Sequence, residues 1–372
     1  MKRKAAPTWT TAGLLELGRS YQVAALYAAA VELKVFDPLA GAAMTAERLA
    51  PLLNCDLGAL QILLDALAAV QLLHKQGDRY TLPAKAAAFL TVDGANTILA
   101  MAQRQAHALR CWAQLTRVIK SGRPAKPLPG VRWSSGDLAP FFRALHNIHS
   151  PVADSVIRAV RPLRFKHLLD LGGMAGTWIV AFLRACPAAT ATLLESPRVI
   201  PIARRQFQAA ELSDRVELVA SSRRDPLPRG ADLVWVNSVV SGNSRSQNRA
   251  LFAEIFVALV PGGRVAIRDV FLDATRTRPV AGALFAVTML LDPLSGGSFT
   301  VDEIREDLTA AGFIQPSVRR RTEPMERILV ARKPRRKSPQ PAMADHEPSW
   351  GPEYGFSTGH SGFAPTQPPG PG

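Results

Sequence analysis

The chain has 372 residues, of which 47% are hydrophobic and 20% charged, a composition typical of globular proteins long enough for two domains. We find no apolar run of about 18 residues free of charge or proline and no apolar signal-peptide core, so we expect neither a membrane span nor a secretory leader. Cys55, Cys111 and Cys186 are odd in number and lack metal-ligand spacing, which predicts reduced thiols, no metal site and a cytoplasmic protein.

The formal net charge of +15 suggests an anionic partner such as a nucleic acid. Eight of the positive charges, however, gather at residues 2–4 and 332–337, at the edges of the predicted fold. We interpret them as solvated ends. Residues 1–10 are predicted to form a flexible leader. Residues 334–372, rich in Pro, Gly and Ser, are predicted to be a disordered tail, because they cannot bury enough apolar surface to offset their ordering entropy.

Residues 11–95 show the pattern of a winged-helix-like domain. Apolar residues with helical spacing run from Leu14 to Ala30, and Asp56 is placed to cap an amphipathic helix. Residues 72–82 then predict a strand, a turn containing glycine and a second strand. The helix that would enter DNA in such a domain, residues 56–69, carries no Lys or Arg. Because phosphate contacts dominate affinity for DNA, this face disfavours DNA binding.

Residues 96–160 are predicted to be a helical linker with a Gly- and Pro-rich loop at 121–140. From residue 161 to 333 strands and helices alternate, which predicts an α/β domain with a mostly parallel seven-stranded sheet. The last two strands are expected to pair antiparallel. The predicted strands are 168–171, 192–195, 216–220, 233–237, 265–269, 315–320 and 328–331.

A glycine-rich turn directly after the first of these strands is the strongest chemical signal. Asp170 ends the strand, and Gly172, Gly173 and Gly176 follow, which lets the backbone approach a ligand closely. Glu195 ends the second strand, 25 residues after Asp170, where an acid can accept hydrogen bonds from ribose hydroxyls. Alone, Asp170 could cap a helix and Glu195 could be a solvated strand end. Their order and spacing together predict a nucleoside-cofactor site.

With these motifs the chain resembles the small-molecule O-methyltransferases that depend on S-adenosylmethionine (SAM), a family that includes caffeate, acetylserotonin and polyketide methyltransferases. The resemblance implies a Rossmann-like SAM-binding domain at 161–333, a winged-helix dimerisation domain, a pocket-lining role for 96–160, a homodimer and a small-molecule substrate. It covers about residues 14–333 and rests on 32–37, 45–50, 60–67, 80–83, 170–176, 195–197, 230–233, 261–264 and 310–313.

The chain departs from the family pattern at six positions that matter for the chemistry. Met174 replaces the third of three consecutive glycines, and Asn237 replaces a lysine. Ser222 takes the position of an aspartate that meets the adenine amino group, so both Ser222 and Asn237 stay candidate cofactor contacts. Ser241 takes the position of the histidine that is the family's general base. Serine without a basic neighbour cannot deprotonate an alcohol near neutral pH. Ser298 and Phe299 replace a charged pair near the pocket.

The missing histidine leaves the acceptor and its base open. Positioning supplies much of the rate of methyl transfer, so an acidic enol, an amine or a thiol would serve as acceptor. Alternatively, a base in another part of the chain deprotonates the acceptor. His146 and His149 share a helical face with Phe142 at spacings of four and seven residues and are the candidates. Their alternative interpretation is as ordinary surface histidines.

Three functions are therefore carried forward. The first is a SAM-dependent methyltransferase acting on a small aromatic or polyketide-like acceptor, with O-methylation as its reaction. The second is a SAM-binding relative that does not methylate, and the third is a winged-helix DNA-binding regulator. We predict the first, because both halves of the family pattern occur in one chain.

Overall fold

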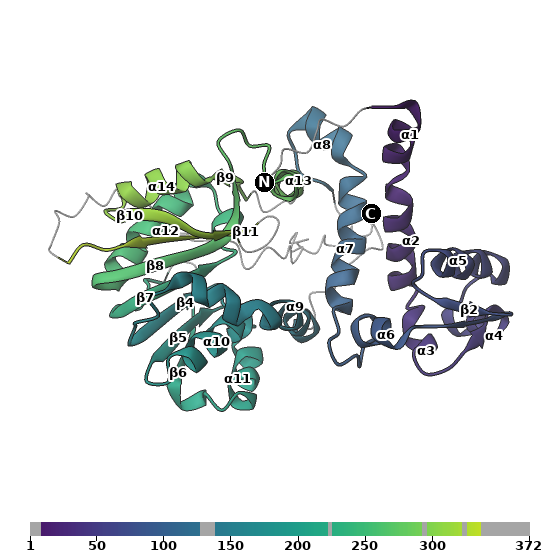
Figure 1. The fold of residues 1–372 in the computed structure, drawn as a ribbon, viewed down its shortest axis with the longest axis horizontal. Helices are drawn as coiled ribbons and strands as arrows, with labels where there is room; N and C mark the ends of the chain where they lie inside the picture. Colours follow the sequence, from purple (N-terminus) through teal and green to yellow (C-terminus); the bar gives the residue numbers. More distant parts are fainter. Residues whose placement is uncertain (1–8, 127–137, 222–224, 292–295, 322–325, 336–372) are drawn as a thin grey trace, which may run out of the picture. The chain divides into compact units, whose positions relative to one another are not determined.

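The computed structural model describes residues 9–126, 138–221, 225–291, 296–321 and 326–335, and these form two compact units (Figure 1). The first unit comprises residues 9–114 and 143–148, and the second comprises 115–126, 138–142 and 149–335. The segment predicted as a linker is divided between them. Residues 1–8 of the predicted leader, the predicted tail beyond 335 and Ser222 lie outside the described residues.

The first unit consists of helices and a small antiparallel sheet in the order β1-β3-β2. The apolar stripe of α5 packs against the hairpin, and Leu60, Leu64, Leu67 and Tyr80 are all buried. The elements are α1 (Thr11–Arg19), α2 (Tyr21–Glu32), α3 (Phe36–Leu39), β1 (Met44–Thr45), α4 (Ala46–Leu53), α5 (Leu57–Ala69), β2 (His74–Gln76), β3 (Arg79–Thr81), α6 (Ala84–Leu90) and α7 (Leu99–Trp112).

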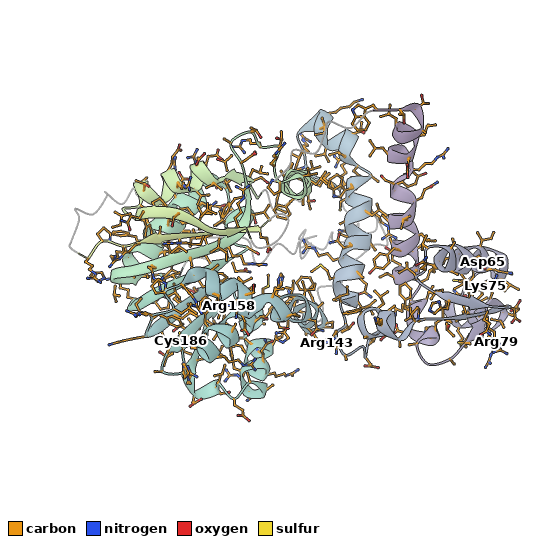
Figure 2. The ribbon with its side chains drawn as sticks, viewed as in Figure 1. Asp65, Lys75, Arg79, Arg143, Arg158 and Cys186 are labelled. Carbon is orange, nitrogen blue, oxygen red and sulfur yellow. The ribbon has the colours of Figure 1, made fainter. Side chains whose placement is uncertain are left out.

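Local signals explain most of these boundaries. Asp56 caps α5 as predicted, accepting a hydrogen bond from the Ala59 N–H at 2.8 Å. The helix predicted from Leu14 to Ala30 is broken at Ser20, whose hydroxyl donates to the Leu17 carbonyl at 2.8 Å. A serine hydroxyl competes for backbone groups in this way and favours helix ends. In the hairpin region, Lys75 donates to the Asp65 carboxylate at 2.6 Å (Figure 2).

The second unit is built on an eight-stranded sheet in the order β10-β11-β8-β7-β4-β5-β6, with β9 paired to β8. All seven predicted strands are present, and β10 and β11 pair antiparallel as expected. The strands are β4 (His167–Leu171), β5 (Thr190–Glu195), β6 (Val216–Ala220), β7 (Ala231–Asn237), β8 (Leu259–Leu272), β9 (Phe299–Thr300), β10 (Ile314–Arg321) and β11 (Glu326–Arg332).

Helices cover both faces of this sheet (Figure 1). One face packs against α12 and α14 through apolar side chains such as Phe252, Ile255 and Leu308. On the other face Trp178 and Phe182 of α10 contact Trp235 of β7, with ring centroids 5.5 and 5.4 Å apart. The helices are α8 (Leu115–Ser121), α9 (Ala139–Ile157), which the two units share, and α10 (Thr177–Ala185), α11 (Ile200–Ala209), α12 (Arg245–Ala258), α13 (Val280–Leu291) and α14 (Val301–Ala310).

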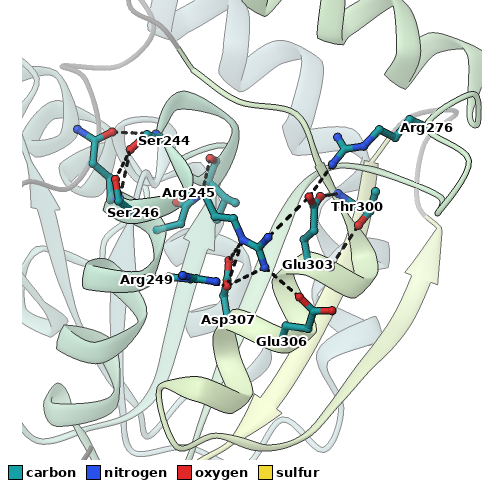
Figure 3. Close-up of polar contacts among 12 residues, drawn as sticks. Ser244, Arg245, Ser246, Arg249, Arg276, Thr300, Glu303, Glu306 and Asp307 are labelled. Atoms are coloured by element: carbon teal, nitrogen blue, oxygen red, sulfur yellow. Dashed lines mark hydrogen bonds and ion pairs between the residues drawn. The ribbon is translucent and has the colours of Figure 1, made fainter. Parts of the chain in front are cut away.

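Ion pairs join α12 to α14 (Figure 3). Arg245, the first residue of α12, contacts the carboxylates of Glu306 and buried Asp307 at 3.0 Å, and Arg249 contacts Asp307 at 2.7 Å. The hydrogen bonds that the Arg245 guanidinium donates to the Asp307 carboxylate raise the pKa of that guanidinium. The network fixes the two helices that cover one face of the sheet.

The strand predicted from Val265 begins earlier, at Leu259, before the Pro261-Gly262-Gly263 turn. Leu259 is the register partner of Ala231 in β7, and the pairing shifts register before resuming at Arg264. The turn is therefore an irregularity inside the strand. Within the described residues, no single helix has the length and apolar composition to cross a membrane; the bent pair α4 and α5 meets that test only when both helices are counted together.

Candidate cofactor and active site

The glycine-rich turn between β4 and α10 has a left-handed backbone over most of its length. Gly172, Met174, Ala175 and Gly176 have φ values of +82°, +50°, +55° and +100°. A residue other than glycine loses about 1 kcal/mol or more in this region, so Met174 and Ala175 are strained. Such strain persists only where the surrounding structure imposes it, and it concentrates at binding sites.

Two of the predicted cofactor glycines are required by the protein's own packing. A Cβ on Gly173 would lie 2.3 Å from Asp170 Oδ2, and a Cβ on Gly176 would lie 2.3 Å from the Phe207 ring. Neither position can carry a side chain without displacing its neighbour. The glycines therefore bring the turn close to Asp170 and to α11, which holds Phe207.

Two buried carboxylates lie at the carboxyl ends of adjacent parallel strands. Asp170 in β4 is 0% exposed and Glu195 in β5 is 2% exposed. Within the described residues neither carboxylate oxygen of Asp170 has a hydrogen-bond partner, while Glu195 Oε2 accepts from the Ser196 N–H at 3.2 Å. Burial, together with the nearby Glu195 charge, raises the pKa of Asp170 well above its usual value.

This pair fits the cofactor that the spacing predicts. Buried acceptors that lack a donor among the described residues, such as the Asp170 oxygens, are costly, so a ligand that brings hydroxyl or ammonium donors to this edge would be favoured. SAM carries ribose hydroxyls, an amino group and a positive sulfonium. Glu195 is the candidate for the ribose, and Asp170 would lie at the turn that accepts the rest of the cofactor.

Asn237, at the end of β7, faces the same turn, but its side chain is hydrogen-bonded to other residues of the protein. It is fully buried, its Oδ1 accepts from Arg268 at 2.9 Å, and its Nδ2 donates to the Gly172 carbonyl at 3.4 Å. Both ends of the amide are therefore used internally. A role for Asn237 in cofactor binding would act through the backbone of the turn.

Ser241, in the position of the family's base, lies in a short 3-10 turn after β7 and is 6% exposed. Its N–H donates to Asp269 Oδ2 at 3.0 Å, and its carbonyl accepts from the Gly297 N–H at 3.0 Å. Asp269 is buried, and burial raises the pKa of its carboxyl group although hydrogen bonds from Ser241 oppose the shift. Asp269 thus holds the loop that carries Ser241.

The two histidine candidates lie on α9, as predicted. His149 Nδ1 is 3.5 Å from Arg268 Nη2, and its ring centroid is 5.7 Å from that of Trp178. Burial, then the Arg268 charge, lowers the pKa of His149 to about 3. A neutral imidazole with so low a pKa is a poor base. His146 is half-buried on the same helix.

The structure gathers Asp170, Gly172, Gly173, Gly176, Glu195 and Asn237 at the carboxyl ends of β4, β5 and β7, as the sequence predicts. It does not bring His149 to Ser241. His149 contacts Arg268, whereas Ser241 contacts Asp269. Because Arg268 and Asp269 are consecutive in β8, their side chains point to opposite faces of the sheet, and their two contacts lie on opposite faces as well. In the described part of the chain, no three His, Cys, Asp or Glu residues are grouped to hold a metal ion.

Sequence reasoning missed Arg268, Asp269 and Glu326. A signal for the first two was present, because Arg268 and Asp269 interrupt the apolar run 265–272 of a strand expected to be buried on both faces. Charged residues there are paired or functional. Glu326, at the start of the last strand, carried no comparable signal.

Two sequence families match the chain. Residues 131–314 match an O-methyltransferase domain, and residues 15–92 match an O-methyltransferase dimerisation domain. The chain belongs to the O-methyltransferase family. The predicted family and fold class are thereby confirmed, as is the primary prediction of a methyltransferase with SAM as donor. The matches support neither of the two alternative functions.

Individual members of the O-methyltransferase family agree with this assignment. The chain is similar to 3-hydroxy-5-methyl-1-naphthoate 3-O-methyltransferase of Streptomyces sahachiroi, at 28% identity over 82% of this chain and 89% of that protein. It is 29% identical to the N,N-dimethyltransferase OxyT of Streptomyces rimosus over 83% and 92%. The structure of human N-acetylserotonin methyltransferase in complex with SAM shares the fold, with a TM-score of 0.74, 23% identity and coverage of 89% and 99%.

Proposed function

We propose that the protein transfers the methyl group of SAM to a hydroxyl group of a small aromatic or polyketide-like molecule. The observation that carries the proposal is the buried Asp170 and Glu195 pair beside the strained glycine-rich turn. SAM, when bound, supplies a methyl group activated by its sulfonium. The named naphthoate substrate of the Streptomyces sahachiroi relative supports an aromatic acceptor.

The surroundings of Ser241 limit the chemical classes of acceptor that the protein can methylate. Ser241 is held by its backbone to Asp269 and Gly297, and His149 is too weak a base to replace the family's histidine. Without a strong base, the acceptor must either lose its proton readily or be nucleophilic before it loses a proton, as a neutral amine is. We therefore infer an acidic phenol or enol. An amine is the second candidate, favoured by the missing histidine and by the similarity to an N,N-dimethyltransferase.

Methyl-labelled SAM tests the proposal with 3-hydroxy-5-methyl-1-naphthoate, substituted phenols of graded hydroxyl pKa and 1-naphthylamine as acceptors. We expect methyl transfer that becomes faster as the hydroxyl pKa falls. A Ser241→His variant should raise the rate most for the least acidic phenol, by about tenfold or more. A protein that binds SAM but methylates none of these acceptors would contradict the proposal.

We further propose that the protein is a homodimer formed through its first unit. No residue of α1 is buried in the single chain, and Leu14, Leu17 and Tyr21 are more than half exposed. An apolar helix face of this kind needs a partner, and the dimerisation domain match supports a second copy as the occupant. A cytoplasmic location is also proposed, supported by the three free cysteines.

Analytical ultracentrifugation tests the dimer. The double variant Leu14→Glu and Leu17→Glu should sediment as a monomer, because two charges cannot be buried unpaired in an interface. Ile62→Glu, which changes an exposed apolar residue of α5 in the same unit, should leave the dimer intact. A monomeric wild-type protein, or a dimer that survives the double substitution, would contradict this interface.

A further inference from the structure

One buried guanidinium contacts Asn237 and Trp178, which connect to opposite ends of the glycine-rich turn. Arg268 of β8 is fully buried and forms an ion pair with Glu326 of the neighbouring strand β11. Its Nη1 donates to Asn237 Oδ1 at 2.9 Å. Its Cζ lies 4.7 Å from the centre of the Trp178 ring, a cation–π contact in a desolvated setting.

Asn237 and Trp178 each connect to one end of the turn. Asn237 Nδ2 donates to the carbonyl of Gly172, where the turn begins. Trp178 is the second residue of α10, which starts where the turn ends. Because Oδ1 of Asn237 accepts from Arg268, only the Nδ2 end can face Gly172, so the arginine fixes the orientation of the amide.

The main chain of Arg268 adds a third contact near the site. Its carbonyl accepts from the Ser238 N–H at 2.9 Å, and Ser238 has a left-handed φ of +54°. Ser238 begins the loop that leads from β7 to Ser241. One residue of β8 is thus bonded to the start of that loop and, through Asn237, to the glycine-rich turn.

We propose that Arg268 and Glu326 act as a clamp that holds the glycine-rich turn in the conformation that accepts the cofactor. Arg268 is then a positioning residue for methyl transfer, and the inference rests on the proposed function. Met174 and Ala175 are strained, and a strained turn keeps its shape only when its surroundings impose it. A buried ion pair on average adds little net stability, which agrees with a positioning role for this one.

Calorimetric titration of the full-length protein with S-adenosylhomocysteine (SAH) tests the clamp. Arg268→Met should raise the Kd for SAH by about tenfold or more, because small displacements of binding groups carry penalties of this size. In the ligand-free variant the amides of residues 172–177 should exchange with deuterium faster than in the wild type. Arg245→Met, which breaks the ion pairs of Figure 3 on the opposite face, should change neither quantity.

The outcomes separate the clamp from the proposed function. A folded Arg268→Met protein with wild-type SAH affinity and wild-type exchange at 172–177 would overturn the clamp, as would equal losses in Arg245→Met. A wild-type protein that fails to bind SAH would contradict the proposed function, while the exchange comparison still decides on the clamp. If Arg268→Met does not fold, Arg268→Lys replaces it. Lysine keeps the positive charge beside Glu326 but lacks the planar guanidinium that bonds Asn237 and stacks on Trp178. The same loss of SAH affinity and the same faster exchange at 172–177 are therefore expected.

Discussion

At the scale of single residues, Gly176 and Gly230 have almost the same φ angle but different surroundings. Their φ values are +100° and +104°. A Cβ at 176 would strike the Phe207 ring, whereas nothing lies within 4 Å of a Cβ at 230. We expect Gly230→Ala to lower the free energy of unfolding by about 1 kcal/mol from backbone strain alone. Gly176→Ala should cost about 3 kcal/mol because the ring must also move. Urea unfolding measures both, and equal losses would show that the contact with Phe207 is unimportant.

The pKa of His149 makes a second prediction at this scale. It is lowered to about 3 in the folded protein, whereas an unfolded histidine titrates near 6.5. Between these values the unfolded chain binds a proton that the folded chain does not, so this group lowers stability as the pH falls below about 6.5. In His149→Gln the free energy of unfolding should therefore fall less steeply between pH 7 and pH 5. Unfolding curves at a series of pH values measure the slope, and an unchanged slope would refute the assignment.

At the scale of elements, the start of α14 depends on a reciprocal cap. Thr300 Oγ1 accepts from the Glu303 N–H at 3.2 Å, and the Glu303 carboxylate accepts from the Thr300 N–H at 2.8 Å. Thr300→Ala should lower the free energy of unfolding by about 1 kcal/mol. Thr309→Ala removes a hydroxyl from the exposed end of the same helix and should change it by less than about 0.5 kcal/mol. Thermal unfolding of both variants provides the comparison. Similar losses would mean that the cap is not what stabilises this helix.

Elements were predictable from the sequence where a local signal was strong. Apolar runs placed the buried strands β4, β5, β7, β8 and β11, and Asp56 placed the start of α5, because burial and capping act within a few residues. The early start of β8 depends on its register with β7, which no local pattern encodes. The two-residue strand β9 exists only because it pairs with Phe271 and Leu272. Pairing between distant segments decided what local reasoning missed.

At the scale of the whole molecule, the same distinction applies to the site. Asp170, Gly172 and Glu195 were predictable because parallel strands bring their carboxyl ends to one edge, so spacing along the chain implies proximity. The ion pair of Arg268 with Glu326 joins residues 58 positions apart on antiparallel strands. Only the folded register shows that their side chains meet. The structure also assigns Asn237 to the protein's own network rather than to open space beside the turn.

The central claim is that the edge carrying Asp170 and Glu195 binds the adenosyl group of the methyl donor. Calorimetric titration of the full chain with SAM and with SAH tests it most directly. We predict micromolar Kd values for the wild type and for Glu306→Ala, which alters an exposed carboxylate in α14. Glu195→Ala should bind at least about tenfold more weakly, because it loses charge-assisted hydrogen bonds to the ribose. Wild-type affinity in Glu195→Ala, or no binding to the wild type at about 1 mM ligand, would contradict the account.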